Sequence, residues 1–118
     1  MSKRIRTVRR SRPVPRRLQS ILDETEARLR NIYGDRFLGL VLFGSHARGG
    51  AVQGSDIDLV LLLRDCVGVR ERRHYAEAVA ELSLRHDVVI SLVPMGIEEY
   101  RMDKTPFLLN VRREGIPL

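Results

Sequence analysis

The sequence predicts a small α+β (mixed α/β) domain in which helices pack against one small mixed β-sheet. Three apolar runs have the length of strands, at residues 37–43, 57–63 and 87–93. Segments with helical spacing of apolar residues lie before, between and after them. The 118 residues have the size of one domain, and the composition of 43% hydrophobic but only 5% aromatic residues indicates an aliphatic core.

The positive charge is concentrated at the N-terminus. Eight of the 21 lysines and arginines fall in residues 1–17, which contain no acid, so the remaining residues carry a net charge of −2. We therefore expect residues 1–13 to form a basic, disordered tail and residues 14–118 to form the domain. The tail fits a solvated segment or an electrostatic arm for RNA, DNA or an acidic partner.

The first half of the domain predicts a helix followed by two strands. A helix is expected at residues 15–33, because Pro15 suits a first turn and Gly34 suits a helix end. A strand at 37–43 ends at Gly44. The next strand, at 57–63, is continuously apolar, which is typical of burial on both faces.

The second half predicts a helix, a strand and two short helices. The helix spans residues 69–85, and the residues expected to face the sheet are Ala76, Val79, Ala80 and Ser83. The strand at 87–93 is expected to end at Pro94. Short helices follow at 97–102 and 107–113, and Gly115 ends the second one.

The connections predict how the strands pair. A helix between the second and third strands favours a parallel crossover, whereas the first two strands must be antiparallel neighbours if their facing ends share one site. Asp87, at the start of the third strand, is then expected at the same sheet edge as Asp56.

Two adjoining motifs carry the chemistry: Gly44-Ser45-His46-Ala47-Arg48-Gly49, and Ser55-Asp56-Ile57-Asp58-Leu59. The side chains of Asp56 and Asp58 point to the same side of a strand, with Cα atoms roughly 6.6 Å apart at about 3.3 Å per residue. Their repulsion would be relieved by a divalent cation, and a phosphate at the Gly44-Ser45 turn would complete a metal–nucleotide site.

These motifs resemble the signature of the minimal nucleotidyltransferases, a family of the DNA polymerase beta-like nucleotidyltransferase superfamily that is often paired with HEPN-domain toxins. The resemblance covers nearly the whole chain after the tail, and it implies the polymerase beta-like palm fold. It also implies ATP as substrate and two Mg²⁺ ions held by Asp56, Asp58 and Asp87. Asp87 would bind the catalytic ion and could take the proton of the attacking hydroxyl.

The first motif supplies the residues expected to bind the nucleotide. Gly44 lets backbone amides approach a phosphate, and Ser45 adds a hydroxyl donor. Arg48 fits a contact with the triphosphate, a salt bridge to one of the aspartates, or both. Ser55 fits a cap of the turn before the second strand or a ligand contact, and His46 fits a surface histidine.

The resemblance implies an antitoxin that transfers AMP to a tyrosine of a HEPN-type ribonuclease toxin. Two alternatives remain open: a non-catalytic antitoxin that acts by binding, and a nucleotidyltransferase directed to RNA by the tail. A small-molecule acceptor is the weakest option. No apolar segment suggests a secretory signal or a membrane span, and the single cysteine, Cys66, fits a reducing compartment, so we expect a cytoplasmic protein.

Overall fold

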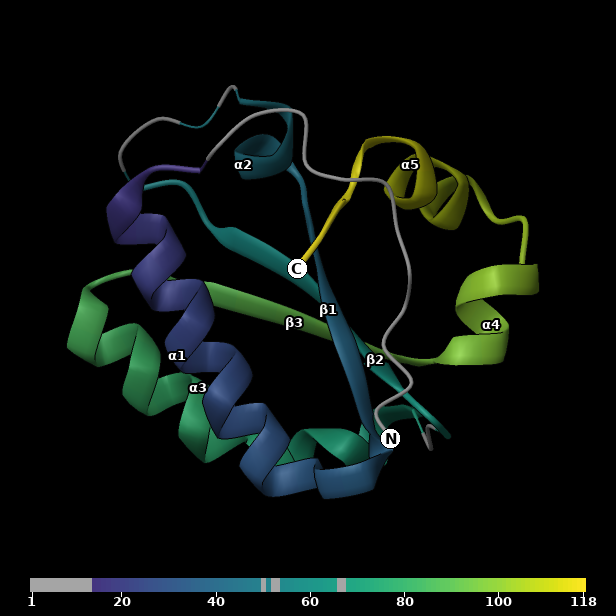
Figure 1. The fold of residues 1–118 in the computed structure, drawn as a ribbon, viewed down its shortest axis with the longest axis horizontal. Helices are drawn as coiled ribbons and strands as arrows, with labels where there is room; N and C mark the ends of the chain where they lie inside the picture. Colours follow the sequence, from purple (N-terminus) through teal and green to yellow (C-terminus); the bar gives the residue numbers. More distant parts are fainter. Residues whose placement is uncertain (1–13, 50, 52–53, 66–67) are drawn as a thin grey trace.

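The structure is a computed structural model that describes residues 14–49, 51, 54–65 and 68–118. The predicted tail at residues 1–13 and Cys66 lie outside the described residues. A mixed sheet with helices on both faces is observed, which confirms the predicted α+β class (Figure 1). Among the described residues, no helix is long and apolar enough to cross a membrane.

The sheet has four strands in the order β3-β2-β1-β4. As predicted, β1 (Phe37–Phe43) and β2 (Ile57–Leu63) are antiparallel, whereas β2 and β3 (Ile90–Gly96) are parallel. The short strand β4 (Ile116–Pro117), which the sequence did not predict, pairs antiparallel with the other edge of β1. Strand β2 therefore lies in the middle of the sheet, which explains its continuous apolar sequence.

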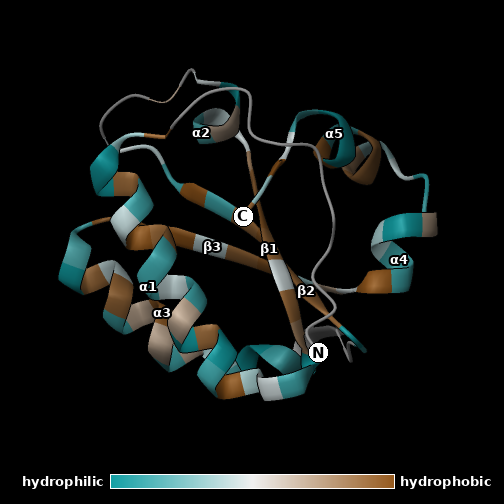
Figure 2. Cartoon of the chain, viewed as in Figure 1, coloured by the Kyte–Doolittle hydropathy of each residue, from teal (hydrophilic) through white to brown (hydrophobic). Residues whose placement is uncertain are grey.

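Two long helices cover one face of the sheet. Helix α1 (Arg16–Tyr33) and helix α3 (Arg72–His86) lie side by side across it (Figure 1). In Figure 2 both helices carry hydrophilic and hydrophobic residues, whereas the strands β1 and β3 are largely hydrophobic. The buried apolar residues between the helices and the sheet include Leu18, Ile21, Leu22, Leu29, Leu40, Leu42, Ile57, Leu59, Leu61 and Leu82.

Two short helices, α4 (Ile97–Met102) and α5 (Pro106–Glu114), pack against the other face of the sheet. Both were predicted within one residue at each end. A smaller core lies beneath them, and its buried residues are Val41, Val60, Leu62, Met95, Tyr100, Leu108 and Val111.

The third helix differs from its prediction in its start and in its buried face. A 3₁₀ helix, η2 (Gly68–Glu71), precedes α3, and the buried residues of α3 are Tyr75, Ala78 and Leu82. Val79 packs against the core as predicted, but Ala76 and Ala80 are exposed, so the predicted face was wrong for these two alanines. Small alanines gave no size contrast to identify the buried face, whereas Tyr75 and Leu82 bury far more apolar area.

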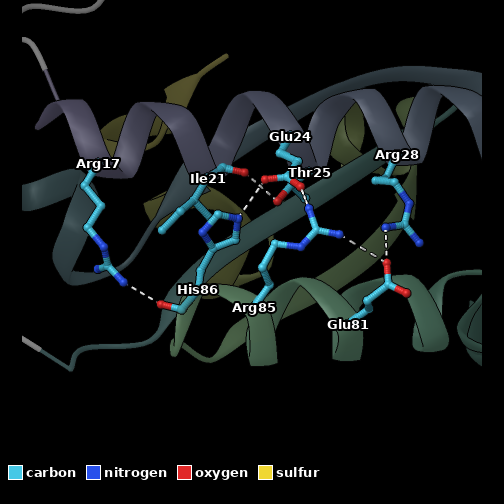
Figure 3. Close-up of polar contacts among 8 residues, drawn as sticks. All are labelled: Arg17, Ile21, Glu24, Thr25, Arg28, Glu81, Arg85 and His86. Carbon is cyan, nitrogen blue, oxygen red and sulfur yellow. Dashed lines mark hydrogen bonds and ion pairs between the residues drawn. The ribbon is translucent and has the colours of Figure 1, made fainter.

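Charged side chains join α1 to α3 along their exposed seam (Figure 3). Glu24 of α1 forms ion pairs with His86, at 2.7 Å, and with Arg85. One turn further along α1, Arg28 pairs with Glu81 at 2.6 Å. Exposed pairs of this kind contribute only about 0–1 kcal/mol each, so the packing of the two helices on the sheet rests mainly on their buried apolar residues.

Strand β3 is shifted along the chain relative to the prediction of 87–93. Asp87 does not begin the strand; it caps the C-terminus of α3 in the left-handed conformation, with φ 54°. The strand begins at Ile90 and continues through Pro94, which lies opposite Leu61. Proline is tolerated there because β3 is an edge strand of the sheet.

Candidate functional site

The candidate site begins with a tight turn at the end of β1. Gly44 has φ 77° and ψ −157°, a conformation that is essentially restricted to glycine. The four-residue helix α2 (Ser45–Arg48) follows at once, and the backbone amides of Ala47 and Arg48 both donate to the carbonyl oxygen of Gly44. Ala47 is buried in the core, which anchors the turn to the sheet.

Asp58 lies directly against this turn. It is the partner of Phe43 in the antiparallel pairing of β1 with β2. A Cβ atom placed on Gly44 would lie 2.4 Å from the Asp58 Oδ2 atom and 3.3 Å from its Cγ atom. The missing side chain of Gly44 is therefore what leaves room for the Asp58 carboxylate beside the turn.

Asp56 and Asp58 share one end of β2, as their spacing predicted. Asp56 is exposed and Asp58 is half-buried. Burial raises the pKa of the Asp58 carboxyl above its ordinary value, the charge of Asp56 raises this pKa further, and His46 and Arg48 oppose the shift. The ionised form of Asp58 is thus disfavoured at this position, and a bound cation would stabilise it.

His46 and Ser55 connect α2 to the segment before β2. The Nε2 atom of His46 lies 3.2 Å from the backbone oxygen of Ser55, within hydrogen-bond distance. His46 is half-buried, so it is less exposed than a typical surface histidine. Behind these residues lies a cavity of about 290 Å³ whose wall includes Leu18, Ile21 and Ile57.

Arg48 is exposed next to the turn, and its ion-pair partner is not an aspartate. Its Nη1 atom lies 3.9 Å from Oε1 of Glu114, at the end of α5. The predicted alternative of a salt bridge to Asp56 or Asp58 is therefore corrected, although the charge of Arg48 does act on Asp58. The sequence carried no signal for Glu114, because only the packing of α5 brings it there.

The three predicted acids do not assemble into one group. Among the described residues, no set of three or more His, Cys, Asp or Glu side chains is placed to hold a metal ion. Asp87 lies in the cap of α3, outside the strand. The residue of β3 in register with Asp58 is Ser91, so the neighbouring position on the sheet holds a hydroxyl in place of a carboxylate.

This fold and this pair of motifs place the chain in a known class. Residues 22–114 match the family model described as a nucleotidyltransferase domain. The match spans most of the chain, which therefore belongs to the nucleotidyltransferase domain family.

Two curated proteins of Methanocaldococcus jannaschii, both provisionally named protein adenylyltransferases, are similar in sequence. One is 37% identical over 76 residues, which are 63% of this chain and 52% of that protein. This chain thus spans only about half of that relative's length. The other is 28% identical over 96 residues, which cover 81% of this chain and 93% of that protein.

Solved structures with the same fold include a toxin–antitoxin with AMP-PNP and a mutant of the toxin–antitoxin MntA-HpeT. The first aligns with a TM-score of 0.57 at 24% identity, over 81% of this chain and 72% of that chain. The second aligns with a TM-score of 0.56 at 25% identity, over 81% of this chain and 70% of that chain. The predicted fold class is confirmed by this likeness.

Proposed function

We propose that this chain transfers AMP from ATP to a hydroxyl group of a protein partner, with Mg²⁺, and that the partner is a HEPN-type toxin. The observation that carries the proposal is the Asp58 carboxylate packed against the Gly44 turn. That contact joins a metal-binding group to a phosphate-binding backbone within one site. The names of the sequence relatives favour a protein acceptor, and the toxin–antitoxin structures favour a toxin as that protein.

The residues present fit a magnesium site. Carboxylate oxygens are the ligands that Mg²⁺ takes from proteins, and it completes its shell with phosphate oxygens and water. Asp56 and Asp58 would hold the ion. The raised pKa of Asp58 shows that its negative charge is disfavoured without a cation, so a bound Mg²⁺ would stabilise that charge. When bound, Mg²⁺ would neutralise the charge that develops on the phosphate oxygens.

The chain's own residues would position the nucleotide for attack. The turn at Gly44 and Ser45 would bind phosphate oxygens, and Arg48 would exchange Glu114 for the triphosphate. The acceptor hydroxyl forms a bond to the α-phosphorus, the bond from that phosphorus to the bridging oxygen breaks, and pyrophosphate leaves. The hydroxyl proton has to depart in the same step, and Asp87 remains our proposal for the group that takes it.

A second candidate function is neutralisation of the partner by binding alone. The observation that favours it is the register of Ser91 with Asp58, since a site without a third grouped carboxylate has fewer ligands for metal ions. This candidate predicts that the double variant Asp56→Asn, Asp58→Asn still protects cells from the toxin. Catalysis predicts that protection is lost.

The direct test is transfer of labelled AMP to a HEPN-type toxin in the presence of Mg²⁺. We expect the toxin to gain the mass of one AMP with the wild-type chain and none with the double variant. Asp23→Asn is the matched control, because Asp23 is exposed on α1 and its side chain accepts only a local hydrogen bond from Gln19 in the structure. If the toxin stays unmodified although the wild-type chain is folded, the proposal is wrong.

A further inference from the structure

An aromatic pair joins α5 to the end of β1. The rings of Phe43 and Phe107 meet edge to face, with centroids 5.3 Å apart and an angle of 86° between their planes. Phe43 is half-buried, whereas 40% of the surface of Phe107 is exposed. The Phe107 ring therefore contacts Phe43 in a favourable geometry while part of it stays open to a ligand.

This pair lies beside the candidate site, on the same side of the sheet as the Asp58 carboxylate. Phe43 and Asp58 are opposite each other in the β1–β2 pairing, and facing residues of antiparallel strands point to the same side. Phe43 also packs against the core beneath α4 and α5, to which Val60 belongs. Asp58, two residues before Val60, therefore faces that side too.

We propose that the exposed ring of Phe107 is a stacking platform for the base of the bound nucleotide. This inference rests on the proposed function, because it takes the α-phosphate to lie at Asp58. The base is attached to the α-phosphate through one ribose, so it must lie close to that carboxylate. Phe107 supplies an exposed aromatic surface there, and aromatic rings stack on any base because every base has a π-face.

The cavity beside His46 is a poorer place for the base. Its wall contains Ile57, Leu18 and Ile21, which belong to the core beneath α1 and α3. Ile57 and Asp58 are neighbours on β2 and point to opposite faces. A nucleotide with its α-phosphate at Asp58 would have to bend around the end of the strand to reach this cavity.

The test compares ATP with inorganic tripolyphosphate, which has the phosphates but no base. Binding of each is measured by titration calorimetry with Mg²⁺. We expect Phe107→Ala to weaken ATP binding by about 5- to 150-fold, as the loss of one base–aromatic stack does, and to leave tripolyphosphate binding unchanged. Leu109→Ala is the matched control, because Leu109 is a similarly exposed apolar residue of α5 that makes no such ring contact in the structure.

The other outcomes overturn the proposal in distinguishable ways. Unchanged ATP binding in Phe107→Ala excludes the platform. The base would then bind elsewhere, for example in the cavity beside His46, or Phe107 would contact the acceptor tyrosine. Equal weakening of both ligands shows that Phe107 acts on the phosphate site or the fold. A wild-type chain that binds neither ligand removes the proposed function itself, and the platform with it.

A spectroscopic variant gives an independent reading that does not depend on removing the ring. The chain contains no tryptophan, so Phe107→Trp places a single indole at this position. We expect ATP to change its fluorescence and tripolyphosphate to leave it unchanged. Equal responses to both ligands, or none to ATP, would contradict stacking at this position.

Discussion

The contact between Gly44 and Asp58 makes a sharp prediction for Gly44→Ala. The substituted residue would keep φ 77° and ψ −157°, which costs about 1–3 kcal/mol for a residue with a side chain. Its methyl group would also lie 2.4 Å from the Asp58 Oδ2 atom, far inside van der Waals contact, so the carboxylate must move. Because the displaced carboxylate adds to the backbone strain, we expect a loss of at least about 1–3 kcal/mol in the free energy of unfolding, together with loss of Mg²⁺–nucleotide binding.

Two other glycines of the chain separate the two causes. Gly34 also has positive φ, at 56°, but a methyl group there would meet nothing within 4 Å, so Gly34→Ala tests backbone strain alone. Gly39, in β1, has open space and no positive φ, and its substitution by alanine should change stability by less than about 1 kcal/mol. Both controls should bind nucleotide as the wild-type chain does.

The assay is urea unfolding followed by circular dichroism, with nucleotide titrations on the same preparations. Stability should rank with the Gly39 variant highest, the Gly34 variant lower and the Gly44 variant lowest. Only the Gly44 variant should lose binding. If Gly44→Ala binds nucleotide normally, the carboxylate does not need the space beside the turn, and the geometric basis of the site is wrong.

Three further predictions concern charge at the site. The pKa of Asp58 is raised in the folded state, so the folded chain binds this proton more tightly than the unfolded chain does. The stability of the wild-type chain therefore falls as pH rises through the interval between the two pKa values. Asp58→Asn should unfold at a higher urea concentration than wild type at neutral pH without divalent ions, and it should bind no Mg²⁺. Glu114→Gln should lower the KM for ATP, because it removes the carboxylate that pairs with Arg48. It should change the free energy of unfolding by no more than about 1 kcal/mol, because the pair is exposed. An unchanged KM would show that the ion pair does not compete with the nucleotide. Ser91→Asp should raise the Mg²⁺ affinity measured by calorimetry, because it adds a carboxylate beside Asp58. Asp87→Asn should leave the Mg²⁺ affinity unchanged. A lower affinity in Asp87→Asn would show that Asp87 does bind the metal ion.

The elements that were predicted well are those whose signals are local. Strands β1 and β2 follow from apolar runs, and α1 and α4 follow from periodicity and from the residues at their ends. The proximity of Asp58 to the Gly44 turn followed from the hypothesis that the two motifs share one site, because that hypothesis requires the two strands to be antiparallel neighbours.

The wrong predictions concern strand ends and a short strand, which depend on the three-dimensional arrangement of the elements. Asp87 looked like the first residue of a strand, but it takes the left-handed conformation that ends α3. Pro94 looked like a strand end, and it is tolerated only because β3 is an edge strand. The strand β4 is too short to have a pattern of its own, and it exists through its pairing with β1.

Helix α5 shows why the rest of the site could not be predicted from the motifs. Its first turn places Phe107 against Phe43, and its last residue places Glu114 near Arg48. A helix of this length is not stable in isolation, so its position depends on burial of Leu108 and Val111 against the sheet. The contact of α5 with the end of β1 and its contact with α2 both depend on these buried residues. In our proposals, base binding therefore depends on the packing of α5, and metal binding depends on the motif.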